Sequence, residues 1–359
     1  MGTVLVANAG STSLKLSLVD EDGRSRPLGA LEDAPRDVEA VGHRIVHGGT
    51  RLVDPTLLDD AAIVVLRELS VLAPLHNGPA LEVVERARAA LPEVPHVAVL
   101  DTAFHATLPD EAHVYPVPGR WRAGQGIRRY GFHGISVAWS VERAAALAGG
   151  PAPRRMVVCH LGGGASATAV LDGRSVDTSM GFGPDDGLVM ATRCGSLDPE
   201  VVLHLVGRVG VPVEEVEHAL NAESGLRALA GRSDMREVEQ AAAAGDPDAA
   251  LALRVYDHRL AAVVAGMAAA LGGLDAVVFT GGVGEGSPRV RREAASRLAF
   301  LGTEVDAALN ERARPDADVA PEGAGVRVLV IEAREDVMIA RDVRALLRAP
   351  QSHDDRRAR

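Results

Sequence analysis

The segment VLVANAGSTSLKLSLVDEDG, residues 4–23, predicts a strand, a small polar turn, a second strand and a further hairpin turn. Residues 4–10 form a short apolar run that ends in a turn signal, whereas residues 14–20 alternate apolar and polar side chains, as a half-buried strand does. A similar layout returns in MVVCHLGGGASATAVLDG, residues 156–173. The two segments share pattern more than identity, so both a duplicated α/β unit and a coincidence stay open.

Between and after these segments, helical and extended patterns alternate along the chain. Apolar residues at a helical period predict helices over residues 55–76, 80–91, 136–149 and 238–271. Apolar runs that end in a small or acidic residue predict single strands over residues 96–102, 275–282 and 326–332. Such alternation is typical of α/β layers, in which ligands bind where strand ends meet loops.

Size and composition exclude several classes of protein. The chain has 359 residues, enough for two domains, and its formal net charge of −11 argues against a general binder of nucleic acid backbones. No basic and apolar leader opens the chain, and a Gly pair and Asp275 divide its most apolar run, residues 260–279, so we expect no membrane span. Cys159 and Cys194 make no disulfide framework and fit a reducing cytoplasm.

Three Gly-rich and hydroxyl-rich loops follow apolar strands, at residues 8–13, 160–166 and 280–287. Such loops expose backbone N–H groups and let a phosphate approach closely. Each loop taken singly reads as a tight turn, but three of one kind predict a phosphate site. None of them has the spacing of a P-loop or of a Rossmann fingerprint. Lys15, the only lysine of the chain, lies in the strand after the first loop, where its ammonium suits a phosphate oxygen.

Charged and titratable residues near predicted strand ends and loops complete the candidate set. Carboxylates at strand ends suit Mg²⁺, and forked guanidinium groups suit a carboxylate or a phosphoryl group. A plainer interpretation treats Asp234 and Asp336 as helix N-terminal charges and His133 as a packed histidine. No Cys/His spacing favours zinc, and no GxSxG favours an acyl-serine hydrolase. The candidates are Arg44, Asp101, His133, Arg193, Asp234, Glu335 and Asp336.

Ten segments, taken in order, resemble the acetokinase family, and they span nearly the whole chain. They are VLVANAGSTSLKLSL (4–18), GHRIVHGG (42–49), APLHNGPAL (73–81), LDTAFHATLP (100–109), RRYGFHGIS (128–136), HLGGGAS (160–166), DTSMGFGPDDGLVMATRCGSLDP (177–199), SGLRALAGRSDMRE (224–237), VVFTGGVGEGS (277–287) and REDVMIARD (334–342). The resemblance implies an α/β fold of two duplicated ribonuclease H-like, actin-like ATPase domains that flank a nucleotide cleft. Their expected bounds are residues 1–102 with 337–359, where the C-terminal helix returns, and residues 103–336, which would bind nucleotide and dimerise.

The resemblance also implies the reversible reaction of ATP and acetate to ADP and acetyl phosphate with Mg²⁺, or Mn²⁺ in its place, and propionate as a further substrate. It implies a cytoplasmic homodimer. Asn8 and Glu335 would organise the metal, Arg44 would hold the acetate, and the catalytic residues would be Asp101, His133 and Arg193. The acyl pocket would comprise Val46, Leu75, Phe132 and Pro184. The nucleotide contacts would be Lys15, Ser11, Ser13, His160, Leu161, Gly162, Gly163, Gly164, Asp234, Met235, Arg236, Gly282, Val283, Gly284, Glu285 and Gly286.

Three features depart from the family pattern. Gly163 and Gly286 stand where the family usually has asparagine, and residues 24–41 are shorter than the family's equivalent. The two glycines motivate an alternative in which pyrophosphate or another nucleotide is the donor. A further alternative is a non-catalytic nucleotide-binding regulator of the actin-like type. Against it stands the presence of Arg44, Asp101, His133, Arg193 and Glu335.

Overall fold

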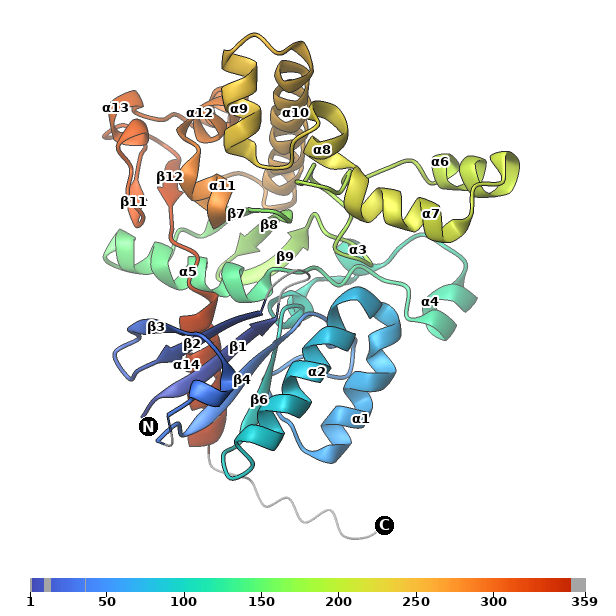
Figure 1. Cartoon of the computed structure of the whole chain (residues 1–359). Coiled ribbons are helices and arrows are strands. Elements are labelled where there is room, and N and C mark those ends of the chain that lie inside the picture. Colours follow the sequence, from blue (N-terminus) through green and yellow to red (C-terminus); the bar gives the residue numbers. More distant parts are fainter. Residues whose placement is uncertain (1, 10–13, 36, 350–359) are drawn as a thin grey trace. The chain divides into compact units, whose positions relative to one another are not determined.

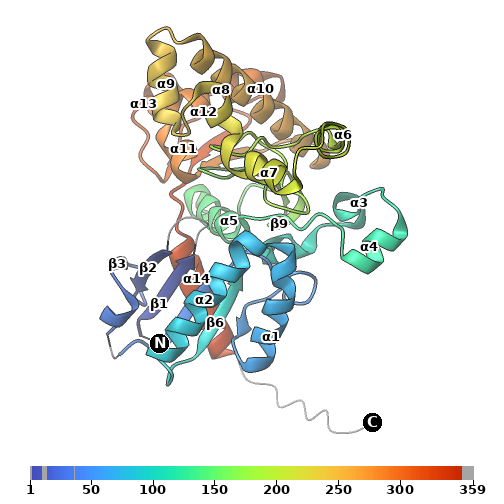
Figure 2. The ribbon, with the colours of Figure 1, turned by 45° about the vertical axis from the view of Figure 1, so that its right-hand side comes forward.

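The computed structural model describes residues 2–9, 14–35 and 37–349, apart from the side chains of residues 74 and 75. The chain divides into two compact units, which are shown in Figures 1 and 2 and described in turn. Unit 1 comprises Met1–Ala103 and Arg334–Arg359, and unit 2 comprises Phe104–Ala333. The predicted bounds assign residues 103 and 334–336 to the second domain, whereas the structure places them in unit 1.

Unit 1 is built on a six-stranded mixed sheet with the order β3-β2-β1-β4-β6-β5. Strands β1, β2 and β3 are antiparallel neighbours, β1, β4 and β6 run parallel, and β5 is antiparallel to β6. The strands are β1 (Val4–Ala9), β2 (Leu14–Val19), β3 (Ser25–Leu28), β4 (Ala40–Ile45), β5 (Thr56–Leu57) and β6 (His96–Leu100). The helices are α1 (Asp60–Leu69), α2 (Pro74–Ala90) and α14 (Glu335–Arg348), with short 3₁₀ turns at Leu31–Asp33 and Ser70–Leu72.

Helices α2 and α14 cover opposite faces of this sheet, because neighbouring residues of a strand point to opposite sides. Val41 packs in one core cluster with Leu5 of β1 and Ala87 of α2. Gly42 faces the other side, where a Cβ atom would meet Ile339 and Val343 of α14. Figure 1 shows α14 crossing behind the strands and α1 and α2 in front of them.

The predicted helix over 55–76 is wrong at its start and at its end. Thr56 and Leu57 form β5 because they pair with β6, and Asp59 then caps α1 by accepting a hydrogen bond from the N–H of Ala62 at 2.7 Å. The helix predicted over 80–91 begins earlier, since α2 starts at Pro74 and runs through Pro79.

Unit 2 repeats the sheet of unit 1, with the order β11-β12-β10-β7-β8-β9. Its first three strands, β7, β8 and β9, are again antiparallel neighbours, β10 and β12 run parallel to β7, and the edge strand β11 is antiparallel. The same order and directions in both units confirm the duplicated α/β fold. The strands are β7 (Arg155–Leu161), β8 (Ala165–Leu171), β9 (Arg174–Thr178), β10 (Ala276–Thr280), β11 (Ala317–Asp318) and β12 (Arg327–Val330).

The helices of unit 2 include several short ones and one long one, α10, which packs beside α9 (Figure 2). They are α3 (Asp110–His113), α4 (Gly119–Gln125), α5 (Gly134–Ala148), α6 (Pro199–His204), α7 (Val213–His218), α8 (Gly225–Ala230), α9 (Met235–Ala243), α10 (Pro247–Ala270), α11 (Gly281–Gly286), α12 (Pro288–Arg297) and α13 (Ala307–Glu311). Short 3₁₀ turns lie at Ala103–Thr107 and Ala299–Leu301, and π-helical turns lie at Leu205–Val209 and Ala219–Glu223.

Two predictions about unit 2 are corrected by local chemistry. The single helix predicted over 238–271 is broken, because Asp246 accepts hydrogen bonds from the N–H groups of Asp248 and Ala249 and Pro247 opens α10 as its first residue. The strand predicted over 275–282 stops at Thr280, and the following Gly-rich residues form helix α11 instead of an open loop.

The apolar run over residues 260–279 is divided as predicted, into the end of α10 and strand β10. Leu271 closes α10, and Gly272 and Gly273 follow it with left-handed backbone angles. In the part of the chain that the structure describes, no helix combines the length and the apolar character needed to cross a bilayer.

A buried imidazole pair, His43 and His96, lies between β4 and β6. Nε2 of His96 is 3.0 Å from the carbonyl oxygen of Leu91, so this nitrogen carries the proton. Nδ1 of His96 therefore accepts a hydrogen bond from Nε2 of His43, at 3.0 Å. Nδ1 of His43 then has no hydrogen-bond partner among the described residues, so a proton there would be buried without an acceptor. Burial, helped by repulsion from His96, lowers the pKa of His43 to about 3.

We expect the stability of the protein to fall as the pH is lowered from 6.5, because the unfolded His43 binds a proton there and the folded one does not. With a shift from 6.5 to about 3, this residue costs about 2 kcal/mol of unfolding free energy at pH 5. Urea unfolding at pH 7.5 and pH 5 measures the loss. In His43→Gln, which keeps an N–H donor but does not titrate, the loss should shrink by that amount. An equal loss in both proteins would contradict the assignment.

Candidate functional site

Unit 1 gathers an amide, a carboxylate and an ammonium group near the ends of β1 and α14. Nδ2 of Asn8 in β1 donates a hydrogen bond to Oε2 of Glu335, the first residue of α14, at 2.8 Å. Lys15 lies directly opposite Asn8 in the β1–β2 register, and directly opposite residues project to the same face of a sheet. Lys15 is exposed, and Glu335 is largely buried with 17% of its side chain accessible.

A buried ion pair stands beside this group. Nη2 of Arg44 donates a hydrogen bond to Oδ2 of Asp101 at 2.7 Å, and Nη1 donates to the carbonyl oxygen of Ala9 at 3.3 Å. The Arg44 and Asp101 side chains are 13% and 1% exposed. Nε of Arg44 lies 4.0 Å from Oε2 of Glu335 and makes no hydrogen bond with any residue that the structure describes. Burial disfavours the guanidinium cation, but Asp101 and Glu335 outweigh it and raise the pKa of Arg44 further.

The Arg44 side chain is therefore held in place, but not all of its N–H groups are used within the described part of the protein. A guanidinium has five N–H donors, and the hydrogen bonds of Arg44 to the described residues engage two of them. The remaining donors can bind a small carboxylate, while Asp101 holds the plane of the fork. Val46 lies two residues after Arg44 and is buried.

Several predicted residues of unit 1 cannot be placed at atomic detail. Ser11 and Ser13 lie outside the described residues, and so does the side chain of Leu75, whose backbone belongs to α2. The other two predicted acyl-pocket residues belong to unit 2, where Phe132 is buried and Pro184 is half-buried.

In unit 2, His133 is held in an unusual backbone conformation. Its φ of 59° lies in the left-handed region, which is strained for a residue with a side chain, and it directly precedes α5. Nδ1 of His133 lies 3.0 Å from the hydroxyl of Ser166. Its ring stacks on that of His160 with centroids 4.2 Å apart, and Nδ1 of His160 is 2.8 Å from the hydroxyl of Ser136. His133 is thus a fixed imidazole at the ends of β7 and β8.

His105, which lies outside the predicted set, explains how this strain is maintained. Its Nε2 donates to the carbonyl oxygen of Phe132 at 2.9 Å, so its Nδ1 accepts from the hydroxyl of Ser175, also at 2.9 Å. Gly131 has a φ of 76° and packs so tightly that a Cβ atom would lie 2.7 Å from the His105 ring. Both contacts fix the backbone immediately before His133.

Arg193 lies on a long loop that the neighbouring segments hold in place. Its Nη1 donates to the carbonyl oxygen of Pro184 at 2.8 Å and lies 3.4 Å from Oδ1 of Asp185. The N–H of Ala191 donates to the carbonyl oxygen of Gly163, which ties this loop to the β7–β8 turn. A Cβ atom on Gly164 would lie 2.8 Å from Nη2 of Arg193 and 3.4 Å from Nε2 of His133. Only glycine at residue 164 lets both groups approach the same point of the turn.

A cavity of about 570 Å³ in unit 2 adjoins this turn. Its walls come from the β7–β8 turn, from the start of α9, from α11 and from the residue before α12. Eight of the predicted nucleotide contacts line it, namely Gly162, Gly163, Asp234, Met235, Arg236, Gly282, Val283 and Gly286. Three lining residues were not among the predicted contacts, namely Ser233, Glu239 and Ser287.

Other predicted nucleotide contacts have structural duties or lie elsewhere. Oε1 of Glu285 accepts hydrogen bonds from the N–H groups of Gly281 and Ala333, at 2.9 and 3.0 Å, so this carboxylate braces the start of α11. Its pKa is raised by burial. His160, Leu161, Gly164 and Gly284 do not line the cavity, and Lys15 belongs to unit 1.

Asp234 caps a helix and also lines the cavity. Its Oδ1 accepts the N–H of Arg236 at 2.9 Å and thereby caps α9, as the plainer interpretation predicts. The guanidinium of Arg236 also donates to this carboxylate, with Nη2 of Arg236 at 2.5 Å from Oδ2 of Asp234. This side-chain hydrogen bond lowers the pKa of Asp234 to about 2. Both residues line the cavity, although Arg236 is exposed.

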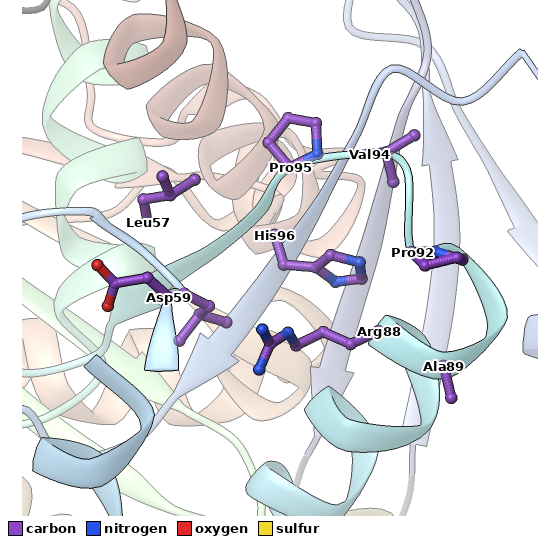
Figure 3. Close-up of a pocket in the computed structure, with 9 residues that line it drawn as sticks. Leu57, Asp59, Arg88, Ala89, Pro92, Val94, Pro95 and His96 are labelled. Atoms are coloured by element: carbon purple, nitrogen blue, oxygen red, sulfur yellow. The ribbon is translucent and has the colours of Figure 1, made fainter. Parts of the chain in front are cut away.

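A second cavity, of about 500 Å³, lies in unit 1 at the amino end of β6 (Figure 3). Asp101 follows the opposite, carboxyl end of the same strand. The walls of this cavity include Leu57, Pro92 and Pro95, and its cation Arg88 is already paired with Asp60 at 3.2 Å. Its other polar residues are also engaged, since Asp59 caps α1 and His96 bonds to the carbonyl oxygen of Leu91, and we assign the cavity no role in the chemistry.

The donor set of unit 1 fits a hard divalent cation. Oδ1 of Asn8 and the Glu335 carboxylate are oxygen ligands of the kind that Mg²⁺ prefers, and Mg²⁺ commonly takes one or two protein ligands together with phosphates and water. Within residues 2–9, 14–35 and 37–349, no group of three or more His, Cys, Asp or Glu side chains could hold a metal ion. The residues therefore fit a shared metal–phosphate site better than a closed protein cage.

Two ribonuclease H-like domains, with a glycine-lined cavity beside an arginine and a histidine, define the chain as a phosphotransferase of the actin-like superfamily. The sequence pattern of the Acetokinase family matches residues 28–341. The chain belongs to the acetokinase family.

Named relatives and solved structures agree with this assignment. The acetate kinase of Clavibacter michiganensis subsp. michiganensis is 50% identical over 87% of this chain and 79% of its own length. The acetate kinase of Pseudothermotoga lettingae is 42% identical over 92% of this chain and 82% of its own length. The crystal structure of a propionate kinase from Francisella tularensis subsp. tularensis SCHU S4 matches with a TM-score of 0.89 and 34% identity, covering 95% of this chain and 99% of that one. The crystal structure of acetate kinase from Porphyromonas gingivalis matches with a TM-score of 0.87 and 32% identity, covering 97% of this chain and 100% of that one. Members of this family are kinases that generally need a divalent metal.

Proposed function

We propose that the protein transfers the terminal phosphoryl group of ATP to acetate, and reversibly from acetyl phosphate to ADP. The observation that carries the proposal is the approach of Arg193 and His133 to the glycine turn that lines the cavity of unit 2. Relatives named acetate kinase and a neighbour named propionate kinase support acetate and propionate as acceptors. The acceptor site would distinguish these acids only modestly, because one methylene changes binding by about 1–3 kcal/mol.

The chemistry needs charge neutralisation more than a base. Acetate has a pKa close to that of a glutamate side chain, about 4.3, so it is already an anionic nucleophile at pH 7. An acetate oxygen forms a bond to the γ-phosphorus, and the bond between that phosphorus and the β,γ-bridging oxygen breaks, which leaves ADP. The obstacle is the approach of one anion to another, which positioned cations remove.

Each group of residues then has a distinct duty. Arg44 binds the acetate carboxylate through its free N–H donors, and Asp101, 2.7 Å from Arg44, orients that guanidinium and accepts no substrate proton. Arg193 and His133 donate to the phosphoryl oxygens as charge develops. Val46, Leu75, Phe132 and Pro184 are the proposed apolar contacts of the acetate methyl group.

The donor would bind in the unit 2 cavity through residues 162–163, 234–236, 282–283 and 286. Lys15, Ser11 and Ser13 would contact its phosphates. Asn8 and Glu335 would hold Mg²⁺, with Mn²⁺ as a substitute, and the bound ion supplies positive charge to the phosphate oxygens. Gly163 and Gly286 leave open space, since a Cβ atom on either would meet nothing within 4 Å. The donor panel below therefore includes pyrophosphate and other nucleotides beside ATP.

An assay of purified protein with acetate and a panel of donors tests the proposal. We expect acetyl phosphate from ATP, trapped as its hydroxamate, with activity lost on chelation of Mg²⁺ and restored by Mg²⁺ or Mn²⁺. Pyrophosphate should give no product, and propionate should replace acetate with a kcat/KM that differs by no more than about 10–200-fold. Absence of acetyl phosphate at millimolar ATP and acetate would refute the proposed donor and acceptor. Product from pyrophosphate alone would establish the alternative donor.

We propose a homodimer without nucleic acid or membrane partners, in keeping with the net charge of −11 and a cytoplasmic location. The surface that supports dimerisation is the pair of helices α6 and α7, which extends from the rest of unit 2 (Figure 1). Their segment carries the exposed apolar side chains Val201, Leu203, Val206, Val209 and Val213. Sedimentation at twice the chain mass of 37.4 kDa would support the dimer, and sedimentation at that mass itself would refute it.

A further inference from the structure

The cavity of unit 2 contains a carboxylate that the proposed reaction has not used. Glu239 lies one helical turn after Met235 on α9, so both project to the same side of this helix, and both line the cavity. The Glu239 side chain is half-buried. A carboxylate in a phosphate-binding cavity is unfavourable unless it faces another part of the ligand, because like charges repel more strongly away from bulk water.

Ser287 fixes this carboxylate. The Ser287 hydroxyl accepts the N–H of Val290 at 3.0 Å as the N-cap of α12, and it donates its single proton to Oε1 of Glu239 at 2.5 Å. Among the described residues, Glu239 receives no other hydrogen bond and forms no ion pair. The nearby guanidinium of Arg236 is committed to Asp234. Oε2 of Glu239 is therefore an acceptor held in the cavity wall without a donor of its own.

The lining of the cavity comes from elements of different charge. Gly162 and Gly163 lie next to Gly164, which Arg193 and His133 approach, so this part of the lining suits phosphate groups. The wall formed by Glu239 and Ser287 repels phosphates and attracts N–H groups. A nucleoside triphosphate carries hydrogen-bond donors on its nucleoside part, as the N–H groups of the base and the hydroxyl groups of the ribose. The nucleoside part then faces α9 and the start of α12, where the amino group of adenine is the donor that distinguishes one base from another.

We propose that Glu239, held by Ser287, accepts a hydrogen bond from the exocyclic 6-amino group of adenine and so selects ATP over nucleotides that carry an oxygen at this position. The inference rests on the proposed use of a nucleotide donor and adds its base specificity. Guanine and hypoxanthine present a carbonyl oxygen where adenine presents the amino group. A carboxylate oxygen repels that carbonyl, and nothing in the pair supplies a proton to it, since the only Ser287 proton is already donated.

The test compares ATP with ITP, which differ at this edge of the base, in the wild type, in Glu239→Gln and in Glu237→Gln. Glu237 is an exposed residue of the same helix that does not line the cavity, so its variant is a matched control. Hydrogen bonds to charged groups support a preference of about tenfold or more in kcat/KM for ATP over ITP in the wild type and in Glu237→Gln. Glu239→Gln should bring the ratio to within about threefold, because the amide can also donate to the carbonyl oxygen.

The ratio is measured within one protein, so a partly unfolded variant does not alter it. A wild-type ratio near one, or an unchanged ratio in Glu239→Gln, would overturn the inference. Competition of ATP and ITP for a fluorescent nucleotide gives the same ratio from binding alone. This readout separates the two proposals. Selective ATP binding without acetyl phosphate formation would refute the proposed reaction and support the base contact. Unselective binding with acetyl phosphate formation would support the reaction and refute the base contact.

Discussion

Replacement of Arg193 by alanine is expected to lower kcat for acetyl phosphate formation by about a thousandfold, with a much smaller change in KM for acetate. Arginines that stabilise a transferring phosphoryl group contribute on the order of 10³–10⁵ to kcat in other phosphotransferases. The Arg193 guanidinium is only 17% exposed and is aimed by the carbonyl oxygen of Pro184 and by Asp185. A group that acts mainly in the transition state affects kcat more than ground-state binding.

The matched control for this variant is Arg259→Ala, since Arg259 is an exposed residue of α10 outside the cavity. It should keep wild-type kcat and KM. Arg193→Lys keeps the charge but loses the planar fork, so an intermediate rate is expected. Circular dichroism and the unfolding midpoint should match the wild type in all three variants. A kcat of Arg193→Ala within tenfold of the wild-type value would show that Arg193 does not stabilise the transferring phosphoryl group.

Replacement of Arg44 by methionine is expected to destabilise the protein by about 3–5 kcal/mol, because it leaves the Asp101 carboxylate buried without its cation. The variant should also lose acetate-dependent activity. The double variant Arg44→Met, Asp101→Leu should recover most of the stability, since a buried ion pair can be replaced by apolar side chains at little cost. It should not recover activity, because nothing then binds the acetate carboxylate.

The exposed pair Arg67 and Glu85, with nitrogen and oxygen 2.6 Å apart, is the control for this experiment. Arg67→Met should cost at most about 1 kcal/mol, because water screens both charges. Denaturant unfolding and acetyl phosphate formation are measured on the wild type and on all three variants. If Arg44→Met is no more destabilising than Arg67→Met, the pair is not the buried interaction described here. If the double variant retains activity, Arg44 does not bind acetate.

Much of the fold could be predicted because the information is local. The apolar runs, Gly-rich turns and alternating strands of residues 4–23 and 156–173 correctly indicated the two hairpins that open each sheet. Helix bounds were less secure. The helical period continues across residues 238–271, but Asp246 and Pro247 end one helix and begin the next. Residues 281–286 are rich in glycine and nevertheless form α11. The carboxylate of Glu285 accepts hydrogen bonds from the N–H of Gly281, at the start of this helix, and from the N–H of Ala333, which is distant in the sequence.

Eight residues that the resemblance implies as nucleotide contacts line one cavity of unit 2, and their role in binding stays a prediction. The sequence alone also predicts Arg44, Asp101, His133 and Arg193 as candidate residues. It missed His105, Glu239 and Ser287. A helical reading could have placed Glu239 on the face of Met235, because the two are four residues apart. No sequence signal could have shown that Ser287, 48 residues away from Glu239, donates to it.

The sequence by itself determined the two α/β units, their Gly-rich turns and the family, since each depends on residue types at short spacing. Only the tertiary structure decided which polar groups are already bonded within the protein and which remain available to a ligand. Asp101 and Arg44 are 57 residues apart and pair because β4 and β6 are neighbours in the sheet. Glu285 is used by the protein, whereas one oxygen of Glu239 is not. The physical reason is that hydrogen-bond donors are few in a buried site, so packing decides which carboxylates they reach.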